Sequence, residues 1–268
     1  MAQQRLIPKF GSKVSLKDYD PDYTHGIDKE HGRAEAEKLE AKLAGLQEKL
    51  YAQSTQSLLV VLQAMDAGGK DGTIKKVFEN VNPQGVYVTS FKAPTPEDLG
   101  HDFLWRIHPH APRDGFIGIF NRSHYEDVLI VRVNELIPAK AVEKRYDDIN
   151  NFERLLADSG TRILKFYLHI SKDEQKQRFQ ERLDRPEKWW KFAVGDLATR
   201  KKWDDYMEAY ETVLTRCNTD YAPWYIVPAN HKWYRDLVVT RAIVETLEDM
   251  KVDYPKPKED LSGIKIPD

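Results

Sequence analysis

The segment Ser57-Leu-Leu-Val-Val-Leu-Gln63 runs directly into Ala64-Met-Asp-Ala-Gly-Gly-Lys-Asp71, and this junction decides the fold class. Continuous rather than alternating hydrophobicity in the first segment predicts a parallel strand that is covered on both faces. A helical pattern follows through Ile74, Val77 and Phe78. A strand, a glycine-rich turn that ends in lysine, and a helix together predict a phosphate-binding loop, in which backbone N–H groups and the helix N-terminus face phosphate oxygens.

This turn departs from the common phosphate-loop pattern at both ends. Ala64 stands where the first glycine is usual, and Asp71 stands where a metal-binding hydroxyl is usual. The alternative is an ordinary strand–helix turn with a solvated lysine. Asp66 argues against it, because a carboxylate beside a phosphate is repulsive unless a metal ion or a proton lies between them. We therefore expect phosphate to bind to Ala67, Gly68, Gly69, Lys70, Asp71, Gly72 and Thr73.

Apolar runs and helical patterns alternate along the rest of the chain. Further strands are predicted over 86–91, 116–120, 162–170 and 224–228, and helices over about 33–51, 97–107, 138–158, 173–184, 201–216 and 232–250. This alternation predicts an α/β fold with a mainly parallel five-stranded sheet. The pattern also predicts an N-terminal arm over 1–30, a single domain over 31–250 and an irregular C-terminal tail over 251–268.

A second polar turn, Asn121-Arg-Ser-His-Tyr-Glu-Asp127, follows the strand predicted at 116–120. Ligands of parallel sheets bind beyond the carboxyl ends of strands, so we expect the two turns to meet although they are far apart in sequence. Arg122 can neutralise charge on a phosphoryl group. Glu126 and Asp127 offer hard oxygen ligands, which favour Mg²⁺ over zinc. The alternative is a strand-to-helix turn whose acids cap the helix.

Residues 172–202 form a basic segment, with ten Lys or Arg against six acids. Arg178 and Arg182 are four residues apart, so one helix face presents both. Pro186 then interrupts the helix before Trp189 and Trp190. Two interpretations remain open, a lid that binds a polyanion and a charged hairpin with two tryptophans in the core. The presence of a phosphate loop in the same chain favours the lid.

Composition excludes several classes of protein. The chain has 268 residues, of which 41% are hydrophobic, and this is enough for a packed core. A net charge of −2 gives no support to a nucleic-acid partner. No apolar run approaches the ~20 residues of a membrane helix, and the N-terminus lacks the apolar segment of a signal peptide. Cys217 is single and cannot form an internal disulfide, so the cytoplasm is the expected location.

Three segments, Met65–Ile74, Phe103–His108 and Asn121–Val128, resemble the polyphosphate kinase 2 family, and Pro186–Phe192 is similar to its lid. The resemblance covers about residues 30–250. It implies a three-layer P-loop kinase-like fold with a helical lid over about 172–202. It also implies phosphoryl transfer between inorganic polyphosphate and nucleotides, with Mg²⁺ or Mn²⁺, by a homo-oligomer (dimer or tetramer).

The resemblance further implies residue roles. Asp66 and Asp127 would hold the metal and the acceptor phosphate. Catalysis would rest on Asp66, Lys70, Arg122, Glu126 and Asp127. Phosphate would also bind to Lys70, Arg122, Arg178 and Arg182, and the nucleotide to Asp66, Asn121, Arg122, Glu126 and Asp127.

The substrate range also follows from the resemblance. The sequence Gly68-Gly-Lys-Asp71, with Asn121 and Glu126, resembles the subgroup (class III) that phosphorylates both nucleoside mono- and diphosphates, AMP/ADP and GMP/GDP. The alternatives are an ATP-dependent kinase of a nucleoside monophosphate or another small acceptor, and a nucleotide-binding regulatory module without turnover. The carboxylates around Lys70 argue against the regulatory module.

Overall fold

Within residues 6–267, the part of the chain that this computed structural model describes, five parallel strands form one sheet. They are β1 (Ser57–Gln63), β2 (Val86–Ser90), β3 (Ile117–Asn121), β4 (Thr161–His169) and β5 (Trp224–Pro228), in the order β2-β3-β1-β4-β5. Every residue of β1 is buried, because this strand has a neighbour on each edge and helices on each face. The parallel five-stranded α/β sheet is therefore confirmed.

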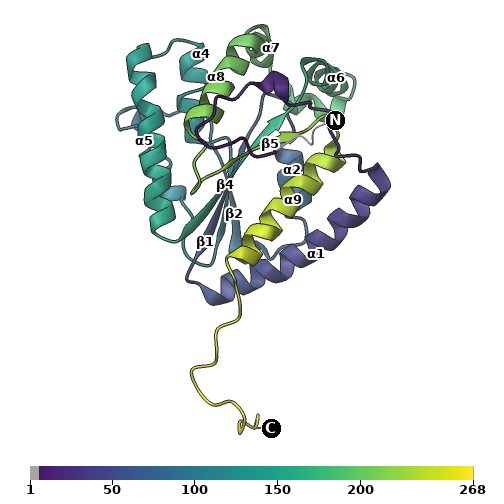
Figure 1. Cartoon of the computed structure of the whole chain (residues 1–268), viewed down its shortest axis with the longest axis vertical. Coiled ribbons are helices and arrows are strands. Elements are labelled where there is room, and N and C mark those ends of the chain that lie inside the picture. The colour runs from purple at the N-terminus through teal and green to yellow at the C-terminus, as the bar shows by residue number, and fades with distance from the viewer. Residues whose placement is uncertain (1–5, 268) are drawn as a thin grey trace.

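Helices cover both faces of the sheet (Figure 1). Helices α1 and α9 pack against each other on one face, and α4, α5 and α8 lie on the other. Helices α6 and α7 lie at the end of the sheet where the strands have their carboxyl ends. The bounds are α1 Lys29–Gln53, α2 Lys70–Val77, α3 Pro96–Leu99, α4 Ile130–Val133, α5 Ala139–Asp158, α6 Lys172–Leu183, α7 Gly195–Lys201, α8 Trp203–Arg216 and α9 Lys232–Asp249.

One predicted helix is largely wrong. Of residues 97–107, only the first three belong to a helix, the short α3, which begins at Pro96. Thr95 and Asp98 form a reciprocal capping box at its start. Gly100 follows its last residue, and the chain from there to Ile107 consists of turns, one of them closed by the hydrogen bond from Trp105 N to Asp102 O. The apolar spacing of this segment reflects burial in successive turns rather than a helix face.

The described N-terminal segment packs against the domain, whereas the C-terminal segment extends away from it. The N-terminal segment 6–28 lies along β5 and α8, where Ile226 N donates to Leu6 O and Val14 N donates to Thr215 Oγ1. Residues 251–267 contain neither helix nor strand and extend away from the sheet (Figure 1). Among residues 6–267, every helix is too short or too polar to cross a membrane.

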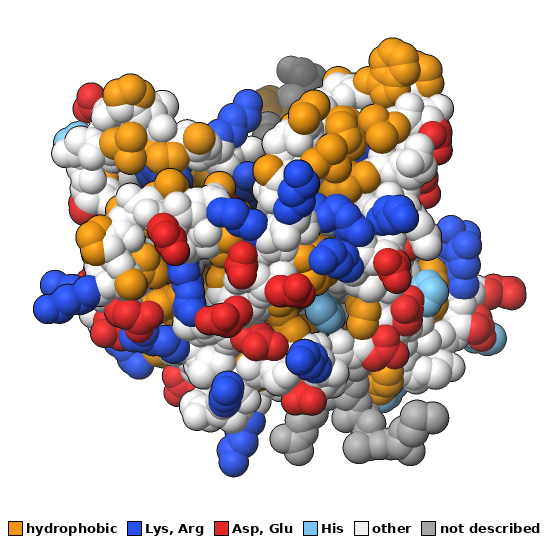
Figure 2. Space-filling view, turned by 90° about the horizontal axis from the view of Figure 1, so that it is seen from above, with side chains coloured by type: hydrophobic (Ala, Val, Ile, Leu, Met, Phe, Trp, Pro, Cys, Tyr) orange, Lys and Arg blue, Asp and Glu red, His pale blue; other side chains and the backbone are white. Residues whose placement is uncertain are grey.

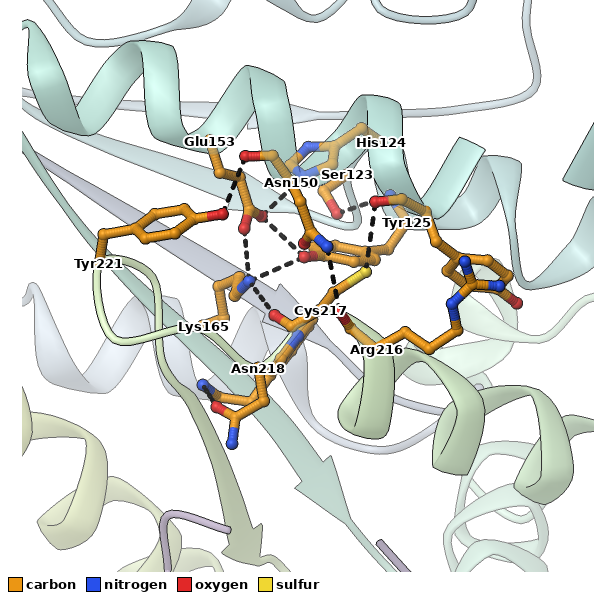
Figure 3. Close-up of polar contacts among 12 residues, drawn as sticks. Ser123, His124, Tyr125, Asn150, Glu153, Lys165, Arg216, Cys217, Asn218 and Tyr221 are labelled. Atoms are coloured by element: carbon orange, nitrogen blue, oxygen red, sulfur yellow. Dashed lines mark hydrogen bonds and ion pairs between the residues drawn. The ribbon is translucent and has the colours of Figure 1, made fainter. Parts of the chain in front are cut away.

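A fully buried polar network lies beneath the turn that follows β3 (Figure 3). Lys165 Nζ on β4 donates to Glu153 Oε2 on α5 at 2.5 Å, to Tyr125 OH at 2.8 Å and to Cys217 O at 2.7 Å. The other Glu153 oxygen accepts from Tyr125 OH at 2.7 Å and lies 3.1 Å from His124 Nε2. The network thus joins the central sheet, helix α5, the turn after β3 and the end of α8.

The charges in this network compensate each other. Burial alone would raise the pKa of Glu153, but the positive charge of Lys165 and the hydrogen bond with His124 hold it below its ordinary value. A buried charge without its partner is costly, because no water replaces the lost interaction.

We therefore predict that Lys165→Met lowers the free energy of unfolding by about 3–5 kcal/mol, since it leaves the Glu153 carboxylate buried and unpaired. Urea unfolding measures this. The matched control is Lys42→Met, because Lys42 pairs with Glu248 at the surface and its loss is expected to cost under about 1 kcal/mol. The double variant Lys165→Met with Glu153→Leu is expected to recover most of the loss. Equal costs for the two single variants would contradict the prediction.

Candidate functional site

The two polar turns meet at the carboxyl end of the sheet. Strands β1 and β3 are neighbours, with Leu62 aligned to Asn121. Arg122 Nη2 donates to Asp66 Oδ1 at 3.0 Å, and Asn121 Nδ2 donates to Asp71 Oδ1 at 2.7 Å. The expectation that the turns come together is confirmed by these two contacts.

Each turn contains a residue in the left-handed backbone region. Ala67 has φ 59° and Arg122 has φ 61°. A non-glycine residue held there costs about 1–3 kcal/mol, and such residues cluster at ligand sites. Gly68 is needed for a different reason: a Cβ there would lie 2.5 Å from the Cβ of Ala64. The backbone of both turns is thus held in a conformation that the sheet alone does not require.

A cleft of about 790 Å³ opens over these turns. Figure 2 looks onto this end of the molecule and shows Lys and Arg side chains gathered around a hollow. The glycine-rich loop, the end of β2, the basic segment and the start of α9 supply its walls. Its charged lining residues are Asp66, Lys70, Asp71, Lys92, Arg122, Arg178, Glu181, Arg182, Lys188, Lys191, Asp196, Lys232 and Arg235.

Lys70 lies among both cations and carboxylates. Its Nζ donates to the carbonyl of Ala64 at 2.9 Å. Burial, and then the charge of Arg122, lowers the pKa of Lys70, while the neighbouring carboxylates oppose this. Burial raises the pKa of Glu126, and the positive charges of Arg122 and Lys70 oppose that shift. Glu126 therefore lies within electrostatic range of Asp66 and Lys70, but it is not among the residues that line the cleft, and its role stays a prediction.

Asp127 faces away from this group. Its Oδ1 lies 3.3 Å from Arg145 Nη1 and its Oδ2 lies 3.5 Å from Arg106 Nη2. Arg145 also donates to the Asp127 carbonyl at 2.9 Å. Asp127 is buried, burial raises its pKa, and it is not among the residues that line the cleft. Its role as a metal ligand stays a prediction.

Arg178 binds the backbone of the glycine-rich loop. Its Nη1 donates to the carbonyls of residues 67 and 68, both at 3.0 Å. Its Nη2 donates to the carbonyls of residues 229 and 230, and its Nε donates to Glu174. These contacts engage all five N–H groups of the guanidinium. The geometry therefore favours a positioning role for Arg178 rather than direct phosphate binding.

The basic segment consists of α6, a 3₁₀ helix (Pro186–Lys191) and α7. Trp189 and Trp190 are 59% and 78% exposed, so the hypothesis of a hairpin with tryptophans in the core is wrong. Arg182 Nη1 donates to Lys191 O at 2.8 Å, which fixes the turn, and it lies 3.8 Å from Asp196. The segment forms one wall of the cleft, as a lid would.

Four arginines near the site were missed by sequence reasoning or left without a role. Arg106 lies inside the segment 103–108, which the family resemblance includes, so a signal existed for it. Arg145 and Arg235 lie in ordinary amphipathic helices, where an arginine usually means a solvated surface. Arg200, on α7, donates to Lys172 O and Gln175 Oε1 and so ties α7 to α6.

Comparison with known proteins identifies the family. A family model described as polyphosphate kinase 2 matches residues 26–255. The chain belongs to the polyphosphate kinase 2 family. It is 55% identical over 260 residues to the AMP/ADP-polyphosphate phosphotransferase of Meiothermus ruber, which covers 96% of this chain and 97% of that protein. The crystal structure of polyphosphate kinase 2 from Arthrobacter aurescens superposes with a TM-score of 0.93 at 46% identity, covering 96% of this chain and 92% of that one.

A further relative has a narrower name. The chain is 46% identical over 262 residues to the ADP-polyphosphate phosphotransferase of Rhodopseudomonas palustris, which covers 92% of this chain and 90% of that protein. Membership of the family makes this polyphosphate kinase an enzyme of polyphosphate-dependent nucleotide phosphorylation, as the sequence predicts.

A buried histidine lies outside the cleft of this kinase, at the end of β4. His169 Nε2 lies 3.1 Å from the carbonyl of Tyr19, and Nδ1 has no hydrogen-bond partner among the described residues. Burial lowers the pKa of His169 from 6.5 to about 4. Between these two pH values only the unfolded chain takes up this proton, so the contribution of His169 to stability falls as the pH falls.

We predict that acidification from pH 7 to pH 4 removes about 3 kcal/mol of stability through His169, and that His169→Asn abolishes this part of the pH dependence. Urea unfolding at several pH values measures the difference between the two proteins. The exposed His101 provides the control variant His101→Asn, which is expected to keep the pH dependence of the unmodified enzyme. Parallel pH profiles for His169→Asn and the unmodified enzyme would contradict the prediction.

Proposed function

We propose that this enzyme phosphorylates both nucleoside mono- and diphosphates, AMP and ADP as well as GMP and GDP, with inorganic polyphosphate as the donor. The observation that carries the proposal is the cleft in which the glycine-rich loop, the second turn and the basic segment meet. The printed name of the relative from Meiothermus ruber, which includes both AMP and ADP, supports the broad acceptor range.

Charge neutralisation would be the main contribution of these residues. Phosphoryl transfer requires positioned cations and an in-line geometry more than a protein nucleophile. Lys70 and Arg122 lie at the junction of the two turns, where they would contact the phosphoryl group that moves. Arg182, Lys188 and Lys191 line the cleft from the basic segment, where they would contact the polyphosphate chain. The backbone N–H groups at the start of α2 would complete the phosphate site.

The donor set fits a magnesium ion that is shared with the substrates. Among residues 6–267 no group of three or more His, Cys, Asp or Glu could hold a metal alone. Mg²⁺ characteristically keeps several waters and binds through one or two carboxylates together with substrate phosphates. Asp66 lines the cleft, and the described residues give its carboxylate one hydrogen bond, from Arg122. When bound, Mg²⁺ or Mn²⁺ would screen the charge on the phosphates.

Other parts of the proposal rest on sequence alone. A cytoplasmic location, a homo-oligomeric state (dimer or tetramer) and the absence of a nucleic-acid partner stay predictions. So does the binding of the nucleotide by Asn121, Glu126 and Asp127.

Incubation with AMP, Mg²⁺ and polyphosphate, without ATP, is expected to yield ADP first and then ATP. Polyphosphate is the only phosphoryl source in this mixture, so chromatography of the nucleotides tests the donor and the acceptor range together. A mixture with AMP and Mg²⁺ alone is the control. ATP-dependent kinases would give no product in either mixture, and that result would refute the proposal.

Asp66→Asn is expected to lower kcat roughly a hundredfold or more and to raise the Mg²⁺ concentration needed for half-maximal rate, since a neutral amide is a weaker metal ligand. Asp127→Asn is expected to lose most turnover while the protein stays folded. Steady-state kinetics over a range of Mg²⁺ measures both effects. The control is Asp253→Asn, an exposed carboxylate paired with Lys49. Unchanged Mg²⁺ dependence in Asp127→Asn would contradict its metal role.

A further inference from the structure

Arg235, in the first turns of α9, is a buried cation with part of its hydrogen-bonding capacity unused. Its side chain is 3% exposed. Nε and Nη2 both donate to Asp236 Oδ1, at 2.9 and 2.7 Å. Nη1, which carries two N–H groups, has no hydrogen-bond partner among residues 6–267. Arg235 nevertheless lines the cleft, so a ligand in the cleft can approach it.

The unpaired end of this guanidinium lies against the glycine-rich loop. A Cβ built on Gly69 would lie 2.1 Å from Arg235 Nη1, and a Cβ on Gly72 would lie 3.5 Å from Nη2. Gly69 is also the N-cap of α2 and has φ 106°, a conformation that favours glycine. The arginine therefore occupies space that only a glycine at position 69 leaves open. It adds a full positive charge at a helix N-terminus, which already attracts anions.

Arg178 lies beside the same glycine as Arg235 but differs in the use of its N–H groups. Both guanidiniums lie beside residue 69, since a Cβ there would also lie 3.4 Å from Arg178 Nη1. Arg178 uses all its N–H groups on protein acceptors, whereas Arg235 leaves Nη1 unpaired. The two positive charges repel each other, and the charge of Arg235 contributes to the lowered pKa of Arg178, after burial. An anion in the cleft, beside both guanidiniums, would offset this repulsion.

We propose that Arg235 binds a phosphate of the polyphosphate donor through Nη1, with Asp236 fixing the orientation of the guanidinium. The inference rests on the proposed phosphate site at the loop and on polyphosphate as the donor. Polyphosphate has neither base nor sugar, so its affinity must come from successive cations. Lys188, Lys191 and Lys232 line the same cleft and supply further cations for such a series. The nucleotide, in contrast, carries few phosphates and has other groups to bind.

The test compares KM for polyphosphate with KM for ADP. The double variant Arg235→Gln with Asp236→Asn removes the cation without leaving a buried carboxylate unpaired. It is expected to raise KM for polyphosphate about tenfold, the size of one charge-assisted hydrogen bond, and to leave KM for ADP within about twofold. Arg235→Lys keeps the charge and is expected to fall between. The control, Arg241→Gln, removes an arginine of the same helix that pairs with Glu35 instead of lining the cleft, and is expected to change neither KM.

Several results would overturn the inference. An unchanged KM for polyphosphate would do so, as would a rise in KM for ADP alone. A purely structural role would lower the unfolding temperature and kcat without changing the ratio of the two KM values. A crystal structure of the unmodified enzyme with tripolyphosphate avoids the variants altogether: a phosphate oxygen is expected within about 3.2 Å of Nη1. Tripolyphosphate bound in the cleft without this contact would refute the inference.

Failure of the proposed function gives a different result. If the unmodified enzyme forms no product from polyphosphate, the donor assignment is wrong. Tripolyphosphate binding without the Nη1 contact, in an enzyme that does use polyphosphate, would instead overturn only the role of Arg235.

Discussion

The buried ion pair between Lys165 and Glu153 fixes the turn after β3, and the geometry of the site depends on that turn. Lys165 donates to the hydroxyl of Tyr125, and this hydroxyl donates to Glu153. The Glu153 carboxylate also contacts His124 (Figure 3). With these two side chains held in the interior, Arg122, two residues before His124, and Glu126, directly after Tyr125, act on Lys70 through their charges. Among the described residues His124 Nδ1 has no hydrogen-bond partner, but the other polar groups of this buried network are paired. The network allows few alternative arrangements, because each displaced group would lose its partner. The buried network therefore fixes the part of the cleft that the turn after β3 forms.

Three arginines also shape the cleft, and they differ in how many of their five N–H groups bind protein acceptors. Arg178 donates all of them to protein acceptors and so fixes the carbonyls of residues 67 and 68. Arg122 donates to Asp66 and links the two turns. Arg235 pairs with Asp236 on one side and leaves the other side unpaired. A planar guanidinium suits these tasks because its donors point in fixed directions. The number of donors left over distinguishes a positioning residue from a ligand-binding one.

The sequence predicts β1, β3, β4 and β5 well because a short, continuous apolar run between polar turns is typical of a parallel strand buried on both faces. It also predicts β2, although this strand lies at the edge of the sheet and has no buried residue. Contact between the two turns is equally predictable, since both follow strands that a parallel sheet places together. The orientation of Glu126 and Asp127 is not, because both lie in a 3₁₀ helix (His124–Asp127), where successive side chains diverge by about 120°. Arg235 gives no signal in the sequence, since the role proposed for it depends on its contact with Gly69, which lies in a distant part of the chain.

The contacts of the basic segment divide it into an anchored base and an exposed tip. Arg178 ties α6 to the loop and to residues 229–230, and Arg200 ties α7 back to the start of α6. Between them, Trp189 and Trp190 are largely exposed. Motion of the whole of α6 would break the four hydrogen bonds from Arg178 to the carbonyls of residues 67, 68, 229 and 230 and release the loop backbone. If the basic segment acts as a lid, as the sequence predicts, it must bend beyond Arg178, so that the tip moves while the phosphate loop keeps its shape.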